Sequence, residues 1–128
     1  MFSDLVGIPF RNGGRDTSGL DCWGLAMMIY GRYGITLPDF VIDSFACNVI
    51  ENTAWEEVSE RRWEQAFVVD NDHVPLLVLI RNNPRFVNHV GVYIGDGQLI
   101  HTNADSGVVI AHITGHLESR IEGYYRRV

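Results

Sequence analysis

The stretch VNHVGVYIGDGQLIHT, residues 87–102, decides what kind of fold this chain adopts. Both of its halves are rich in β-branched and aromatic residues, and Gly95-Asp96-Gly97 between them is typical of a tight turn. The pattern predicts a β-hairpin whose strands lie at about 88–94 and 98–102.

Each predicted strand of this hairpin carries one histidine, His89 and His101. If the turn is formed by Asp96-Gly97, His89 lies near residues 102–104 and His101 lies near Val92. The two imidazole rings then approach each other only if the hairpin has a bulge or a shifted register.

The rest of the chain divides into helices first and strands afterwards. LDCWGLAMMIYGRYG, residues 20–34, has apolar residues at helical spacing and predicts a buried helix, ended by its glycines and by Pro38. Weaker helical patterns cover about 43–50 and 53–61, and the glutamates of the second suggest a solvated face. Four further β-rich runs predict an antiparallel meander with the hairpin: AFVV (66–69), PLLVLIR (75–81), GVVIAHI (107–113) and EGYYRRV (122–128). We therefore expect a single α+β domain over residues 1–128.

Composition excludes several classes of partner. The formal net charge is −6, which disfavours nucleic acid and anionic lipid as partners because both require a basic surface. No run is long enough to cross a bilayer, and the first residues lack the basic and apolar regions of a secretory signal. We expect synthesis as a soluble cytoplasmic chain. The two cysteines, Cys22 and Cys47, do not form a disulfide framework or a paired zinc motif.

Cys22 is the first candidate for chemistry. It stands at the start of the predicted buried helix, after a loop rich in Gly and Asp. Unpaired N–H groups and the positive end of the helix dipole lower the pKa of a thiol there and can hold an oxyanion. A lone cysteine is, however, most often a small buried core residue.

The histidines favour the catalytic interpretation. A thiol needs an imidazole to accept its proton and return it to a leaving amine, and a third polar group must fix the tautomer of that imidazole. His89 and His101 on adjoining strands fit these two roles. Two satisfied sheet histidines, or a zinc site made of Cys22, His89 and His101, are the alternatives.

These residues resemble the NlpC/P60 cysteine peptidases. GIPFRNGGRDTSGLDCWGL, residues 7–25, is similar to the family's nucleophile motif, and HVGVYIGDGQLIHT, residues 89–102, to its histidine motif. The resemblance implies a papain-like fold and cleavage of peptide bonds in bacterial peptidoglycan, without a metal or other cofactor. Trp23, ITLPDF (35–40) and EGYYRRV (122–128) resemble the branch found in phage and prophage tails. That implies tail or baseplate proteins as partners and action at the cell wall, while a tail protein that keeps the fold with little activity is the alternative.

Carried over to this chain, the family's pattern makes Cys22 the nucleophile, His89 the general base and His101 the third polar residue. The backbone at Asp21 and Cys22 would form the oxyanion hole. Asp21 would either bind a substrate amine or cap the helix.

The loop before Cys22 and the strand before His89 show two departures from the family's pattern. Phe10 stands where many members have a tyrosine, and the strand before His89 reads HVPLLVLI (73–80), which predicts an apolar wall beside the site. Arg11 and Arg15, in the loop before Cys22, would contact acidic groups of the stem peptide; the alternative is that they are solvated loop arginines. The remaining histidines and Cys47 are expected to have no catalytic role: His73, His112 and His116.

Overall fold

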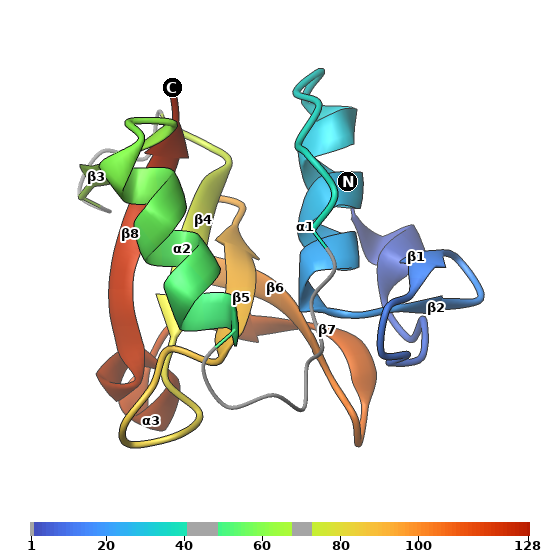
Figure 1. Cartoon of the computed structure of the whole chain (residues 1–128). Helices are drawn as coiled ribbons and strands as arrows, with labels where there is room; N and C mark the ends of the chain where they lie inside the picture. The colour runs from blue at the N-terminus through green and yellow to red at the C-terminus, as the bar shows by residue number, and fades with distance from the viewer. Residues whose placement is uncertain (1, 41–48, 68–72) are drawn as a thin grey trace.

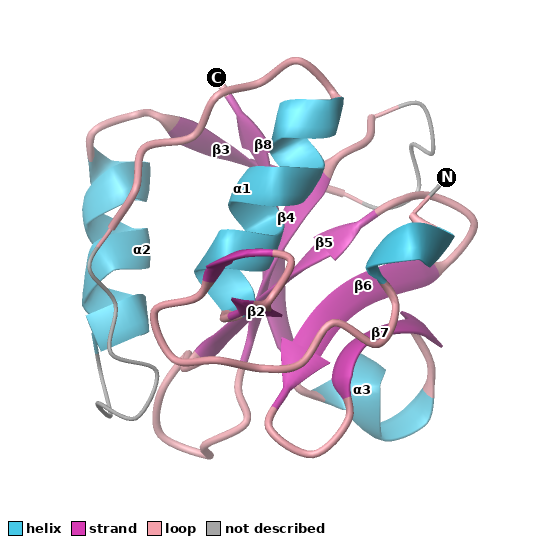
Figure 2. Ribbon diagram, turned by 90° about the vertical axis from the view of Figure 1, so that its right-hand side faces the viewer, coloured by secondary structure: helices cyan, strands magenta, loops and turns pink. Residues whose placement is uncertain are grey.

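The computed structural model describes residues 2–40, 49–67 and 73–128. A six-stranded antiparallel sheet forms its centre, with α1 and α2 over one face (Figures 1 and 2). The helices are α1 (Cys22–Arg32), α2 (Val49–Ser59) and α3 (Gly115–Ser119), preceded by a 3₁₀ turn, η1 (Ser3–Leu5). The sheet strands are β3 (Trp63–Ala66), β4 (Leu76–Ile80), β5 (His89–Tyr93), β6 (Gln98–Asn103), β7 (Gly107–His112) and β8 (Ile121–Arg127). A small hairpin, β1 (Arg15–Asp16) with β2 (Gly19–Leu20), precedes α1.

The predicted α+β class is confirmed, but the strand order differs from a simple meander. The order is β3-β8-β4-β5-β6-β7, so the last strand enters between β3 and β4. β4 is thereby a central strand, and all five of its residues are buried, as its uninterrupted apolar sequence requires. Of the predicted run 66–69, residues 68 and 69 lie outside the described residues, and the strand there begins earlier, at Trp63.

Two clusters of buried side chains hold the layers together. The larger one joins the apolar side of α1 to the sheet through residues such as Leu25, Ile29, Leu79 and Val92. The smaller one lies around Leu76, Val78, Ile80, Tyr93 and Leu99, with Leu117 of α3 packed against it. Alternate residues of β4 belong to different clusters because successive side chains of a strand point to opposite faces.

The helix α2 contains a charged residue in an unexpected place. Glu57 was expected on a solvated face, but its relative exposure is only 5%. Its carboxylate accepts hydrogen bonds from Arg62, Arg127 and the Trp63 indole, which compensates for the loss of hydration. The helix period explains the burial, since Glu57 follows Ile50 and Ala54 along the side that packs on the sheet. The predicted helix at 43–50 lies mostly outside the described residues.

Candidate active site

Cys22 occupies the first position of α1, as predicted. Asp21 is the N-cap, and its Oδ1 accepts a hydrogen bond of 2.7 Å from the backbone N–H of Gly24. The loop before it packs directly on this first turn: a Cβ at Gly24 would lie 2.2 Å from the carbonyl oxygen of Gly14. The glycines of the motif are therefore needed for the close approach of the loop to the helix.

Asp21 is fully buried, and its carboxylate is occupied by the protein itself. Besides the Gly24 amide, it accepts hydrogen bonds from the backbone N–H of Gly13 at 3.1 Å and from the Arg15 guanidinium at 2.6 Å. The structure thus gives Asp21 a capping and loop-holding role. A substrate amine would have to replace one of these donors, so amine binding by Asp21 stays a prediction.

The Cys22 thiol is buried, with 3% relative exposure. Burial raises its pKa to about 11 and is the largest effect on it. The backbone N–H of Val90 acts in the opposite direction, the nearby Asp21 carboxylate raises the pKa further, and the N–H groups of Cys22 and Trp23 lower it. The expected lowering by the helix start is therefore present, but burial outweighs it. Three backbone N–H groups at the sulfur are also the kind of donors that stabilise an oxyanion.

Val90 is the contact that sequence reasoning missed. Its side chain lies in the larger core cluster and lines the same cavity as Cys22, and its backbone N–H lies near enough to the thiol to lower the pKa of Cys22. Because Val90 directly follows His89 and α1 packs against β5, Cys22 lies close to the strand that carries His89. A backbone group has the same chemistry in every residue type except proline, so the residue type at position 90 does not reveal this role.

His89 and His101 meet directly. Nε2 of His89 lies 3.1 Å from Nδ1 of His101, and the ring planes are inclined by 67°. The pKa of His89 falls to about 3, first because of burial and then because of the positive charges of His101 and Arg120. Burial also lowers the pKa of His101, again with Arg120 adding to the effect.

A bulge in the β5–β6 hairpin makes the contact between His89 and His101 possible. Gln98 donates to the carbonyl of Gly95, while the N–H of Ile94 donates to Gln98, so two residues of one strand oppose one of the other. Gly95 takes up this conformation at φ 96°. The pairing of Val92 with Ile100 is one residue away from the simple register, and a one-residue shift moves every side chain to the other face. His89 and His101 consequently share a face.

Gly91 makes room for the histidine pair. A Cβ at this position would lie 3.2 Å from Cβ of His101 and 2.8 Å from a methyl carbon of Leu99. The absence of a side chain between the two histidines lets their rings approach across the strands.

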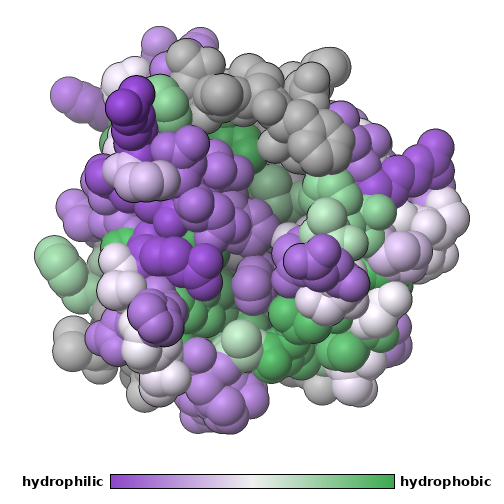
Figure 3. Space-filling view, turned by 90° about the horizontal axis from the view of Figure 1, so that it is seen from below, coloured by the Kyte–Doolittle hydropathy of each residue, from purple (hydrophilic) through white to green (hydrophobic). Residues whose placement is uncertain are grey.

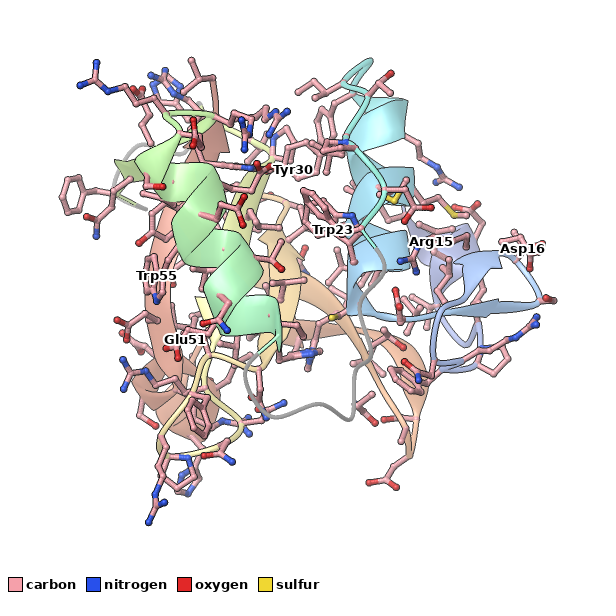
Figure 4. All side chains as sticks on the ribbon, in the orientation of Figure 1. Arg15, Asp16, Trp23, Tyr30, Glu51 and Trp55 are labelled. Atoms are coloured by element: carbon pink, nitrogen blue, oxygen red, sulfur yellow. The ribbon has the colours of Figure 1, made fainter. Side chains whose placement is uncertain are left out.

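An apolar cavity adjoins the thiol. Cys22, Trp23, Phe40, Leu77, Leu79 and Val90 are among the residues that line it. Leu77 and Leu79 supply the apolar wall that the sequence of β4 suggested. Trp23 lies on the side of α1 that faces α2, and Arg15 lies beside α1 (Figure 4).

Phe10 and Arg15 both lie in the segment that precedes α1, and their roles in substrate binding stay predictions. Phe10 is half-buried and pairs with Leu20 through its backbone, and it is absent from the described lining of the cavity at Cys22. The Arg15 guanidinium donates hydrogen bonds within the protein, to the side chains of Asp21 and Asp39 among others. Cys47 lies outside the described residues.

Within the part of the chain that the structure describes, no group of three or more His, Cys, Asp or Glu side chains is placed to hold a metal ion. Likewise, no helix described here is long and apolar enough to cross a membrane. His73, His112 and His116 are exposed. At the end of the molecule shown in Figure 3, hydrophobic side chains form patches between hydrophilic ones.

Known proteins resemble this chain in sequence and in fold. The sequence pattern described as the NlpC/P60 family matches residues 7–121. A probable endopeptidase NlpC homolog of Haemophilus influenzae is 28% identical over the whole chain, which spans 60% of that protein. The murein DD-endopeptidase MepS/murein LD-carboxypeptidase of Escherichia coli K12 is 27% identical over 87% of the chain and 50% of its own length.

Solved structures share the fold. A Staphylococcus aureus protein of the NLP/P60 family, described as similar to lipoprotein, has a TM-score of 0.65 at 19% identity, covering 98% of this chain and 38% of its own. The NlpC/p60 domain of the peptidoglycan hydrolase SagA has a TM-score of 0.56 at 19% identity, covering 98% and 91%. Both likenesses support a papain-like α+β fold. The sequence pattern of the NlpC/P60 family covers most of the residues of this chain, and the chain therefore belongs to that family.

Proposed function

We propose that this protein is a cysteine peptidase that cleaves amide bonds in the stem peptides of peptidoglycan. The observation that carries the proposal is the contact between His89 and His101, with His89 on the strand β5 that packs against α1, the helix that begins at Cys22. The named endopeptidases among its relatives support the substrate class.

In the proposed reaction, Cys22 is the nucleophile and His89 the general base. If Nε2–H of His89 donates to Nδ1 of His101, Nδ1 of His89 keeps the lone pair that accepts the thiol proton. The raised pKa of Cys22 and the lowered pKa of His89 mean that both are neutral at rest near pH 7. The proton therefore moves to His89 as the sulfur attacks the carbonyl carbon.

The attack produces a tetrahedral intermediate whose oxyanion can be held by the N–H groups at the start of α1 and at Val90. When the C–N bond breaks, the imidazolium of His89 returns the proton to the leaving amine. Water then attacks the thioester, with His89 again accepting a proton, and releases the carboxylate and the thiol. His101 fixes the tautomer of His89 throughout.

Digestion of purified sacculi tests the proposal, with released muropeptides identified by mass spectrometry. Wild type should release peptide fragments, and Cys22→Ala should release none. His89→Ala should lose at least about a hundredfold in rate, as expected for removal of a general base. Cys47→Ala, the chain's other cysteine, is the matched control and should keep activity. Equal release by wild type and Cys22→Ala would refute the thiol mechanism.

We further propose that the protein acts as a component of a phage tail or tail-like particle that helps it pass the cell wall. Three sequence features that resemble the tail-associated branch support this: Trp23, residues 35–40 and residues 122–128. The first two of these pack against each other. The Trp23 indole donates to the carbonyl of Pro38 at 3.0 Å, and its ring lies 5.2 Å from that of Phe40. Detection of the protein in purified particles by mass spectrometry tests the assignment; absence from them would contradict it.

A tail protein with little activity is the second candidate. The burial of the Cys22 thiol and its raised pKa favour it, because a protonated, enclosed thiol is a poor nucleophile. It predicts that Cys22 reacts with iodoacetamide at neutral pH no faster than a free thiol and that sacculi stay intact.

A further inference from the structure

The cavity at Cys22 is small. Its free space is about 30 Å³, which is room for about one water-sized group. Apart from Thr53 and Glu57, its described walls are apolar or aromatic, and the Glu57 carboxylate is already held by Arg62 and the Trp63 indole. A methyl-sized group fits beside the thiol, whereas a long or charged side chain does not.

One wall of this cavity belongs to the segment 36–40, which follows α1. Phe40 lines the cavity and packs on Trp23, and the Trp23 indole holds the carbonyl of Pro38. Both contacts fasten the segment to the first turn of α1, next to the nucleophile. The width of the cavity therefore depends on how firmly residues 38–40 are held.

Arg15 holds the same segment from the other side. Its Nε donates to Asp39 at 2.9 Å, and one terminal nitrogen donates to the carbonyl of Phe40 at 2.9 Å. The other terminal nitrogen donates to Asp21 at 2.6 Å and to the carbonyl of Gly14 at 2.9 Å. The planar guanidinium thus joins the helix cap below Cys22 to the wall of the cavity.

The ion pairs that Arg15 forms with Asp39 and with Asp21 differ in strength. Asp39 is mostly exposed, and an exposed ion pair alone contributes little. Asp21 is fully buried, so its bond to Arg15 has a well-defined geometry and is not weakened by water. Arg15 is accordingly fixed at the cap and reaches out from it to the segment 38–40.

We infer that Arg15 is a positioning residue that holds Phe40 as a specificity-determining wall, so that the site admits only a small apolar side chain next to the scissile bond. The substrate part of this inference rests on the proposed function. It assigns to that function peptides with an alanine-sized residue at the position facing the cavity.

The test measures access to Cys22 and needs no peptidase activity. In a Cys47→Ser background, Cys22 is the only thiol. Its alkylation rates with iodoacetamide and with the bulkier N-benzyl iodoacetamide are compared, and their ratio reports the width of the cavity. Phe40→Ala and Arg15→Ala should each raise the relative rate of the bulky reagent at least about fivefold.

Control variants distinguish a specific change at the cavity wall from a general loss of packing in the protein. Arg11→Ala changes an exposed arginine of the same loop and should leave the ratio at the wild-type value. Asp39→Ala removes one contact of Arg15 without touching the cap and should give an intermediate ratio. If Arg15→Ala does not fold, Arg15→Lys takes its place, because lysine keeps the positive charge beside Asp21 but lacks the planar fork that also reaches the Phe40 carbonyl. An unchanged ratio in folded Phe40→Ala, or in the folded Arg15 variant, would overturn the inference, whatever the result with sacculi.

Discussion

The charge state of His89 can be tested through stability. A histidine that must stay neutral when folded makes the folded state less stable in acid, because only the unfolded state can bind the proton. His89 has an ordinary pKa of 6.5 when unfolded and a pKa of about 3 when folded. Its contribution is therefore intact above pH 6.5 and is lost progressively as the pH falls toward 3.

The magnitude follows from the two pKa values. Between pH 6.5 and pH 4.5, protonation of the unfolded state at this one site lowers the free energy of unfolding by about 2.3 kcal/mol. In this range the result requires only that the folded pKa lies below about 4. Substitution His89→Gln removes the titrating group, so the variant should lose about 2.3 kcal/mol less than wild type over the same interval. His101 and the carboxylates titrate in both proteins and largely cancel in the comparison.

Urea unfolding, followed by tryptophan fluorescence at pH 6.5, 5.5 and 4.5, measures these free energies. His112→Gln, which changes an exposed histidine, is the control and should follow the wild type. If wild type and His89→Gln lose the same free energy within about 0.5 kcal/mol, the pKa of His89 is not lowered in the folded protein. The burial argument for a neutral His89 at rest would then be refuted.

Two further substitutions test the packing around the site. Gly91→Ala places a carbon 3.2 Å from Cβ of His101 and 2.8 Å from Leu99. We therefore expect the free energy of unfolding to fall by about 1–2 kcal/mol. We also expect the digestion of sacculi to fall by a larger factor than the amount of folded protein. Equal activity per folded molecule would contradict the spacing argument. Glu57→Gln leaves its two arginines without their buried carboxylate and should cost about 2–3 kcal/mol in urea unfolding, whereas the exposed Glu60→Gln should change stability by less than about 0.5 kcal/mol.

The sequence alone predicted the helices and strands whose formation depends mainly on residues that are close together in the chain. The buried helix starting at Cys22 follows from apolar spacing and a capping aspartate, and the hairpin follows from Gly95-Asp96-Gly97 between two β-rich runs. The class, α+β, follows from the change of period along the chain. The choice of Cys22, His89 and His101 as candidates also came from residue type and order, with their catalytic roles still proposals.

Only the tertiary structure decided how these pieces meet. The order of the strands depends on β8 entering beside β4, a pairing between distant segments that no local pattern encodes. The contact between His89 and His101 depends on a one-residue bulge at Gly95, and that single residue reverses which face each side chain takes. The burial that raises the pKa of Cys22 likewise depends on neighbouring residues from several elements, and so does the buried position of Glu57. Residue identity determines what chemistry is available, whereas the packing of distant segments determines the solvation and charge under which it operates.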